Sequence, residues 1–189
     1  MRYSFPNINA SRIFGGLVLA LFVLSLSGCK QNMIYGRAVQ DLNVKAQEAL
    51  TQGDTAKAVS RLEAALDLVP DEPRTRYNLA VAYQQNKNWD KAVKLLEVLD
   101  KDQSGGESLQ ESQDVVLSLA SAYQNLAESM LPEKPGQKLD AAKHAQIESL
   151  FQKALAAYDR VKLDKPEKKD EVQFQKQVIE RLRARANAL

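Results

Sequence analysis

Few side chains in this sequence could carry out chemistry. The chain contains one cysteine, Cys29, and one histidine, His144. A single cysteine cannot form an internal disulfide, and a lone histidine cannot complete a transition-metal site without further His or Cys ligands. Paired carboxylates at 71–72 and 170–171 stand where helices are expected to begin, so we interpret them as favourable to helix dipoles. With no glycine-rich phosphate-binding fingerprint either, the sequence predicts no catalytic residue, no metal and no cofactor.

The N-terminal segment, from Met1 to Gly28, has the composition of a targeting signal. Arg2 and Arg12 supply positive charge, and a ten-residue run follows at Leu17–Leu26 that is apolar except for Ser25. This apolar run is shorter than the roughly 20 residues needed to cross a bilayer, and it has the length of a secretory signal. We therefore exclude residues 1–28 from the expected fold.

The end of that segment, Leu26-Ser27-Gly28-Cys29, resembles the lipobox of bacterial lipoproteins. The resemblance implies cleavage after Gly28 and covalent lipid on Cys29, and several acyl chains on one residue give a lasting membrane anchor. The alternative is an ordinary secretory signal followed by a stray cysteine. Lys30, where inner-membrane lipoproteins have Asp, implies the outer membrane facing the periplasm if the source is Gram-negative. In any other source Lys30 carries no such information, and the lipid anchor is expected in the outer face of the plasma membrane.

The region from Leu42 to Asp100 contains the same pattern twice. Five residues recur at one constant spacing: Ala46 as Ala80, Lys57 as Lys91, Ala58 as Ala92, Val59 as Val93 and Leu62 as Leu96. The recurring alanines are small where two helices must approach closely, while Leu79, Tyr83 and Trp89 supply bulk. This pattern resembles the tetratricopeptide repeat (TPR), a helical hairpin with a period of about 34 residues. The resemblance implies an all-α, right-handed solenoid of about three hairpins, each stacked on the next.

A third hairpin is expected further along the chain. Leu119, Ala120 and Tyr123 repeat Leu79, Ala80 and Tyr83 after slightly more than one period, and Phe151 repeats Leu96 after a longer interval still. The difference between the two intervals corresponds to an insertion of about 15 residues inside this hairpin. Because the insertion includes Pro132 and Pro135, which a continuing helix does not tolerate, we expect a protruding loop, either functional or harmless.

These patterns divide the chain into segments. We expect a signal peptide at 1–28, a lipidated tether at 29–40, hairpins at about 41–70, 73–100 and 113–161 with an insertion at 126–140, and a C-terminal capping helix at 166–189. A polar linker at 101–112 joins the second and third hairpins, and Pro166 is expected to break the chain before the last helix. Arg181, Arg183 and Arg185 on that helix are either solvated or form a basic patch for acidic lipid or an acidic partner.

The composition and charge of the chain do not point to nucleic acid as a partner. Hydrophobic residues make up 44% of the chain and charged residues 26%, as in ordinary globular proteins. Without Arg2 and Arg12 the chain keeps 24 basic residues against 24 acidic ones. A balanced charge gives no support to nucleic-acid binding.

The TPR resemblance also implies a binding surface, because the first helix of each TPR hairpin lines a concave groove that takes peptides. Carried over by alignment, the groove positions are Asn43, Gln47, Leu50, Arg74, Tyr77, Val81, Gln84, Gln85, Leu117, Ser121, Gln124 and Asn125. Amides both donate and accept hydrogen bonds, so such a groove suits a neutral or mixed segment. The carboxylate clamp of some TPR domains is not expected: only Asn78 matches it, and the aligned basic positions hold Asn43, Asp114 and Ser118.

The sequence thus predicts a membrane-anchored, non-enzymatic adaptor that holds a protein or peptide partner at the bacterial cell envelope. By architecture it resembles small TPR lipoproteins that serve envelope or pilus assembly, secretion, or regulation of cell-wall enzymes. The alternative is an accessory binding protein for a glycan or lipid, which would use the insertion and the basic last helix.

Overall fold

The described part of this chain is built from helices. The computed structural model describes residues 35–102, 109–133, 137–163 and 166–189, so the predicted signal peptide and lipobox lie outside the described residues. The described part forms seven helices and no strand. They are an N-terminal helix at 35–51, α2 (Thr55–Leu68), α3 (Pro73–Gln85), α4 (Trp89–Asp102), α5 (Leu109–Ser129), α6 (Ala141–Arg160) and α7 (Pro166–Asn187).

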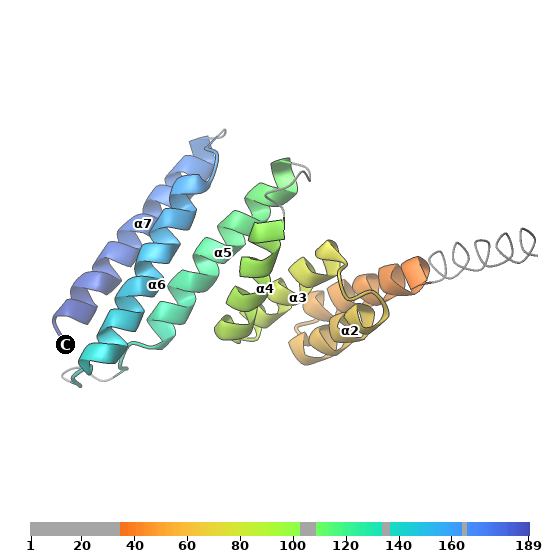
Figure 1. The fold of residues 1–189 in the computed structure, drawn as a ribbon, viewed down its shortest axis with the longest axis horizontal. Coiled ribbons are helices and arrows are strands. Elements are labelled where there is room, and N and C mark those ends of the chain that lie inside the picture. The colour runs from red at the N-terminus through yellow and green to blue at the C-terminus, as the bar shows by residue number, and fades with distance from the viewer. Residues whose placement is uncertain (1–34, 103–108, 134–136, 164–165) are drawn as a thin grey trace, which may run out of the picture.

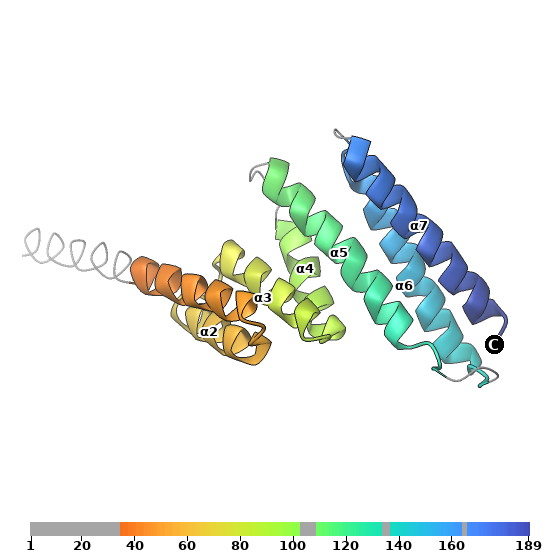
Figure 2. The same ribbon diagram turned by 180° about the vertical axis from the view of Figure 1, so that it is seen from behind.

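The helices follow one another along the long axis of the molecule in chain order (Figures 1 and 2). From α2 onward each helix contacts the next one in sequence, and α3 also contacts α5. Such nearest-neighbour stacking defines a solenoid, in which each hairpin buries its apolar face only against the adjoining hairpins. The predicted all-α solenoid of three hairpins and a capping helix is therefore confirmed.

Side-chain caps set the helix starts. Asp54 accepts a hydrogen bond from the backbone N–H of Lys57 at 3.0 Å, and Asp140 accepts one from the backbone N–H of Lys143 at 2.7 Å. Glu72 caps α3 by accepting from both the backbone N–H and the hydroxyl of Thr75. Each cap satisfies donors that the first helical turn leaves without a partner.

The turns inside the first two hairpins share one backbone path. Gly53 and Lys87, one repeat period apart, have φ angles of +78° and +57°. The following residue donates its N–H back to the preceding helix in both turns, from Asp54 to the Ala49 carbonyl and from Asn88 to the Tyr83 carbonyl, each at 2.8 Å. The left-handed residue reverses the chain at the same point of each repeat.

The core contains most of the residues that the repeat singled out. The small side chains of Ala46, Ala58, Ala80, Ala92 and Ala154 are buried at the helix contacts, and so are the larger ones of Leu62, Leu79, Tyr83, Leu96 and Phe151. Trp89 is an exception. It is the first residue of α4 and is only half-buried.

The insertion in the third hairpin lengthens helices as well as a loop. Aligned with α3, which ends at Gln85, α5 would end at Asn125, but it continues to Ser129. The first turn of the predicted insertion at 126–140 is therefore helical, and the expectation of a loop is wrong for these residues. Its next part does not protrude freely: Leu131 is buried, and Arg185 of α7 donates to the Pro132 carbonyl at 2.5 Å. Similarly, α4 extends to Asp102 and α5 starts at Leu109, which shortens the predicted linker at both ends.

Both ends of the solenoid differ from the prediction. The N-terminal helix is already present at residue 35, inside the predicted tether, because Val39 is buried and adds packing to this turn. Pro166 begins α7 instead of breaking the chain before it, since a proline fits the first turn, where its missing N–H is not needed. The carboxylates at 170–171 therefore lie within α7. This helix buries Val172, Ile179 and Ala186 and closes the end of the solenoid against α6.

Candidate protein-binding groove

An open groove of about 1040 Å³ lies at the N-terminal end of the solenoid. Its walls come from the N-terminal helix, the last residue of α2 with the turn that follows it, and the first half of α3. The lining residues are Tyr35, Gly36, Val39, Gln40, Asn43, Val44, Gln47, Leu68, Val69, Pro70, Glu72, Arg74 and Asn78. We call this surface the N-terminal groove.

A hydrogen-bond network fixes the floor of the N-terminal groove. Asn78 donates to Asn43 Oδ1 at 2.7 Å, and Asn43 Nδ2 donates to Thr75 Oγ1 at 2.7 Å and to the Val39 carbonyl at 2.9 Å. Thr75 is fully buried and its hydroxyl in turn donates to Glu72. Because the amides hold each other, this floor sets the spacing of the N-terminal helix and α3.

Three polar side chains on the walls remain available to a ligand. Gln40, Gln47 and Arg74 line the groove, and they make no hydrogen bond or ion pair with the rest of the described chain. Both glutamine amides can donate to and accept from a peptide backbone. The Arg74 guanidinium presents five N–H donors in a plane, which suits a carboxylate.

Apolar side chains converge on the same groove. Tyr35, Val44 and Leu68 are 36%, 52% and 38% exposed. They are half of the six exposed large hydrophobic side chains in the described residues, the others being Val98, Leu163 and Phe174. Scattered apolar residues are normal on a protein surface, but a group of them in one groove is typical of an interaction site.

The structure brings only some of the predicted groove residues together. Three of them, Asn43, Gln47 and Arg74, line the N-terminal groove.

The other predicted residues lie outside this groove. Three are half-buried against the core: Leu50, Tyr77 and Leu117. The Tyr77 hydroxyl lies 3.2 Å from Ser118 Oγ. Val81 and Gln84 are half-buried and Gln85 is exposed, outside the groove. Asn125 donates to the carbonyl and the hydroxyl of half-buried Ser121 at 2.8 and 3.2 Å.

Gln124 does not belong to an accessible surface, and its assignment to the groove is wrong. The side chain is 6% exposed. Gln124 Oε1 accepts from the Tyr158 hydroxyl at 3.2 Å, and Gln124 Nε2 donates to Gln175 Oε1 at 3.0 Å. The amide is thus enclosed between α5, α6 and α7, because the capping helix covers the position that would otherwise face solvent.

Comparison with known proteins supports the solenoid fold. Residues 49–113 match the sequence family described as tetratricopeptide repeat. The TPR domain of Sgt2 from Aspergillus fumigatus superposes with a TM-score of 0.51 at 16% identity, over 80% of this chain and 82% of that one. The fold is a TPR solenoid. The N-terminal domain of stress-induced protein-1 (STI-1) from C. elegans gives a TM-score of 0.49 at 16% identity, over 74% of this chain and 94% of that one.

Ten of the residues that line the groove were not among the predicted ones, and four of these ten lie at 35–40, inside the segment that was interpreted as a tether. The TPR period contains a signal that could have found two of them. Gln40 stands one period before Arg74, and Val44 stands one period before Asn78, so both occupy groove-facing positions of the first repeat. The contribution of Leu68, Val69 and Pro70 depends on how the turn before α3 folds over the N-terminal helix, which the period does not encode.

Other candidate sites of the TPR solenoid are occupied by internal contacts. The C-terminal arginines are one case: Arg183 pairs with Glu148, and this hydrogen bond holds the pKa of the Glu148 carboxyl below its usual value. Arg185 donates a hydrogen bond to the Pro132 carbonyl. His144 Nε2 lies 2.9 Å from Asn187 Oδ1 and joins α6 to α7.

The described part of the chain holds neither a metal-binding cluster nor a membrane-spanning helix. No group of three or more His, Cys, Asp or Glu side chains is placed there to hold a metal ion. Within the same residues, none of the helices has the length and apolar character that crossing a membrane requires.

Proposed function

We propose that this protein is a lipid-anchored, non-enzymatic adaptor of the bacterial cell envelope, which holds a segment of a protein partner in the N-terminal groove. The observation that supports this proposal is the groove itself. Exposed apolar side chains and unengaged polar side chains converge there on a floor that the Asn43–Asn78 pair holds in place.

The chemistry of the groove favours a peptide over a small polar ligand. Val44 and Leu68 offer an apolar surface, and Gln40 and Gln47 offer amides to a peptide backbone. A volume of about 1040 Å³ that is open to solvent fits a short extended or helical segment. Because Arg74 is the one groove cation among the described residues, a partner segment with a carboxylate near it gains a charge-assisted hydrogen bond.

The anchor part of the proposal comes from the lipobox resemblance. Acylated Cys29 would place the solenoid at a membrane surface, the outer membrane facing the periplasm in a Gram-negative source and otherwise the outer face of the plasma membrane. Adaptors in this position serve the assembly or secretion of envelope or pilus machinery, or regulate cell-wall enzymes.

The second candidate, binding of a glycan or lipid by the insertion and the last helix, has less support. It requires a basic surface, but Arg183 and Arg185 are engaged with Glu148 and Pro132. The hydrogen bond from Arg185 to the Pro132 carbonyl also holds this part of the insertion against α7. Only Arg181 of the three arginines is exposed without a partner in the described chain.

Affinity capture from detergent-solubilised membranes tests the adaptor role. We expect the wild-type chain to retain a stoichiometric protein that Arg74→Glu loses, because charge reversal repels the carboxylate and alters the groove wall. Arg181→Glu is the matched control, since it makes the same change on exposed α7. Equal capture by all three chains, or retention of glycan or lipid alone, would contradict the proposal.

Metabolic labelling with palmitate tests the anchor separately. We expect label on the wild-type chain and none on Cys29→Ser. Label on both chains would show that Cys29 is not the lipidated residue. Purified mature chain that turned over hydrolase substrates would contradict the non-enzymatic part of the proposal.

A further inference from the structure

The position of the N-terminal groove relative to the predicted anchor restricts the kind of partner that can reach it. Tyr35 and Gly36 line the groove at its N-terminal end. Cys29 is six residues before Tyr35. A chain of six residues spans at most about 22 Å even when fully extended. If Cys29 carries lipid, Tyr35, at the N-terminal end of the groove, therefore stays within about 22 Å of the membrane surface.

The groove lies at the membrane-proximal end of an elongated molecule. The solenoid extends from the N-terminal helix through to α7 at its other end (Figure 1). The opposite end is closed by the capping helix, with Gln124 enclosed beneath it. The N-terminal groove therefore lies at the end of the solenoid that the tether holds nearest to the bilayer.

A short tether concentrates the groove in a thin layer beside the membrane. A partner that is itself anchored in that membrane shares the layer, so binding becomes a two-dimensional encounter with a raised effective concentration. A freely diffusing partner gains nothing from this restriction. A longer tether would serve such a partner better, because it would let the groove move away from the bilayer.

Building on the adaptor function proposed above, we infer that the occupant of the N-terminal groove is the membrane-adjacent segment of a protein that is anchored in the same bilayer. The segment carries apolar side chains that pack on Val44 and Leu68. It also carries a carboxylate that pairs with Arg74. The groove thus binds a stretch of the partner chain just outside the membrane, and the partner's soluble domains extend further from the membrane.

Site-specific photo-crosslinking in intact cells tests this inference. A photoreactive residue at Val44 lies in the groove, and one at Val98 of α4 is the matched control, because these valines are 52% and 44% exposed and only Val44 lines the groove. We expect Val44 to give one discrete protein adduct that stays with the membrane fraction after a salt and carbonate wash. Sequencing should place the crosslinked peptide beside a membrane span or a lipidated residue of the partner. Val98 should not give this adduct.

The possible outcomes separate this inference from the adaptor function. An adduct from Val44 with a protein that the wash releases would overturn the membrane-anchored partner but leave the adaptor role intact. No protein adduct from Val44, or an adduct with lipid alone, would overturn both.

A spacer in the tether provides a second, independent measurement. About 20 Gly and Ser residues inserted between Lys30 and Gln31 add about 25 Å of root-mean-square reach. Lengthening the tether from about six to about 26 residues lowers the effective concentration about ninefold, because it falls roughly as the −3/2 power of linker length. We expect the Val44 adduct to fall by a similar factor, while the solubilised chain captures the partner as well as wild type does. An undiminished adduct in cells would contradict the inference.

Discussion

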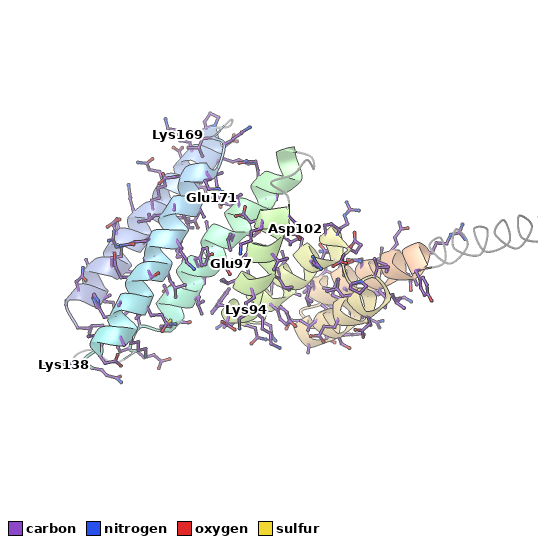
Figure 3. The ribbon with its side chains drawn as sticks, viewed as in Figure 1. Lys94, Glu97, Asp102, Lys138, Lys169 and Glu171 are labelled. Carbon is purple, nitrogen blue, oxygen red and sulfur yellow. The ribbon has the colours of Figure 1, made fainter. Side chains whose placement is uncertain are left out.

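The Tyr83 hydroxyl donates a hydrogen bond of 2.7 Å to Glu63 Oε1 and so joins the second hairpin to the first. The same tie recurs one repeat later, where the Tyr123 hydroxyl donates to Glu97 Oε1 at 2.5 Å (Figure 3 labels Glu97 on α4). A lysine Nζ lies over each ring, Lys91 at 5.1 Å from the Tyr83 centroid and Lys153 at 5.2 Å from that of Tyr123. Each tie connects the second helix of one hairpin to the first helix of the next, so it acts on the stacking of repeats.

These ties predict a loss of stability at alkaline pH. Burial, reinforced by Glu63, raises the pKa of Tyr83 from 10.0 to about 12, and burial with Glu97 raises the pKa of Tyr123 further. Between pH 10 and 12 the folded state keeps the Tyr83 proton that the unfolded chain loses. The stabilisation is therefore fully present below pH 10 and disappears as the pH rises towards 12.

Urea unfolding of the wild-type chain and Tyr83→Phe measures this effect. The variant should be less stable by about 1–2 kcal/mol at pH 8, because it loses a hydrogen bond to a charged group. The difference between the two chains should shrink from pH 10 upward. A difference that stays constant to pH 12 would show that the Tyr83 hydroxyl is not held by Glu63.

The two hairpin turns predict that one substitution in each turn has opposite effects on stability. Gly53→Ala should lower the free energy of unfolding by about 1 kcal/mol, because a Cβ disfavours the left-handed backbone. The surroundings add nothing to this cost, since a Cβ at Gly53 would meet no atom within 4 Å. Lys87→Gly relieves the same strain one repeat later and should raise the stability by about 0.5–1 kcal/mol. Thermal unfolding of the two variants checks both signs, and destabilisation by Lys87→Gly would contradict the left-handed conformation at that turn.

The enclosed amide of Gln124 predicts a structural effect without an effect on binding. Gln124→Ala leaves the buried Tyr158 hydroxyl without its acceptor, so it should cost about 1–3 kcal/mol of stability. Gln84→Ala, on the half-exposed part of α3, should change stability by less than about 0.5 kcal/mol. Partner capture by folded Gln124→Ala should equal that of wild type. If folded Gln124→Ala captured less partner than wild type, Gln124 would belong to the binding surface after all.

The repeat period predicted the stacked hairpins well, because it follows directly from which side chains helices must bury. The small contacts at Ala58 and Ala92 and the tie-forming Tyr83 and Tyr123 all stand at repeated positions. Helix ends were harder to predict: Pro166 is as compatible with a helix start as with a break, and only tertiary packing decides between them. The same holds for residues 35–40, where burial of Val39 extends a helix into a segment of mixed composition.

The candidate groove was predictable only in part for a similar reason. Alignment to the repeat identified Asn43, Gln47 and Arg74, since these positions recur in each TPR hairpin. The same alignment placed Gln124 on the groove, because the repeat pattern does not say that α7 covers this position. Whether a repeated position is open or covered depends on what stacks on it, and that is a property of the whole solenoid.

Hydrogen exchange of the purified chain, alone and with its captured partner, tests most directly where the partner binds. We expect slower amide exchange in the partner-bound chain at 35–47 and at 68–78, the segments that line the N-terminal groove, and unchanged exchange across α6 and α7. Protection centred on α6 and α7, or no protection at 35–47 with a stoichiometric partner bound, would contradict a groove that works by holding a partner segment.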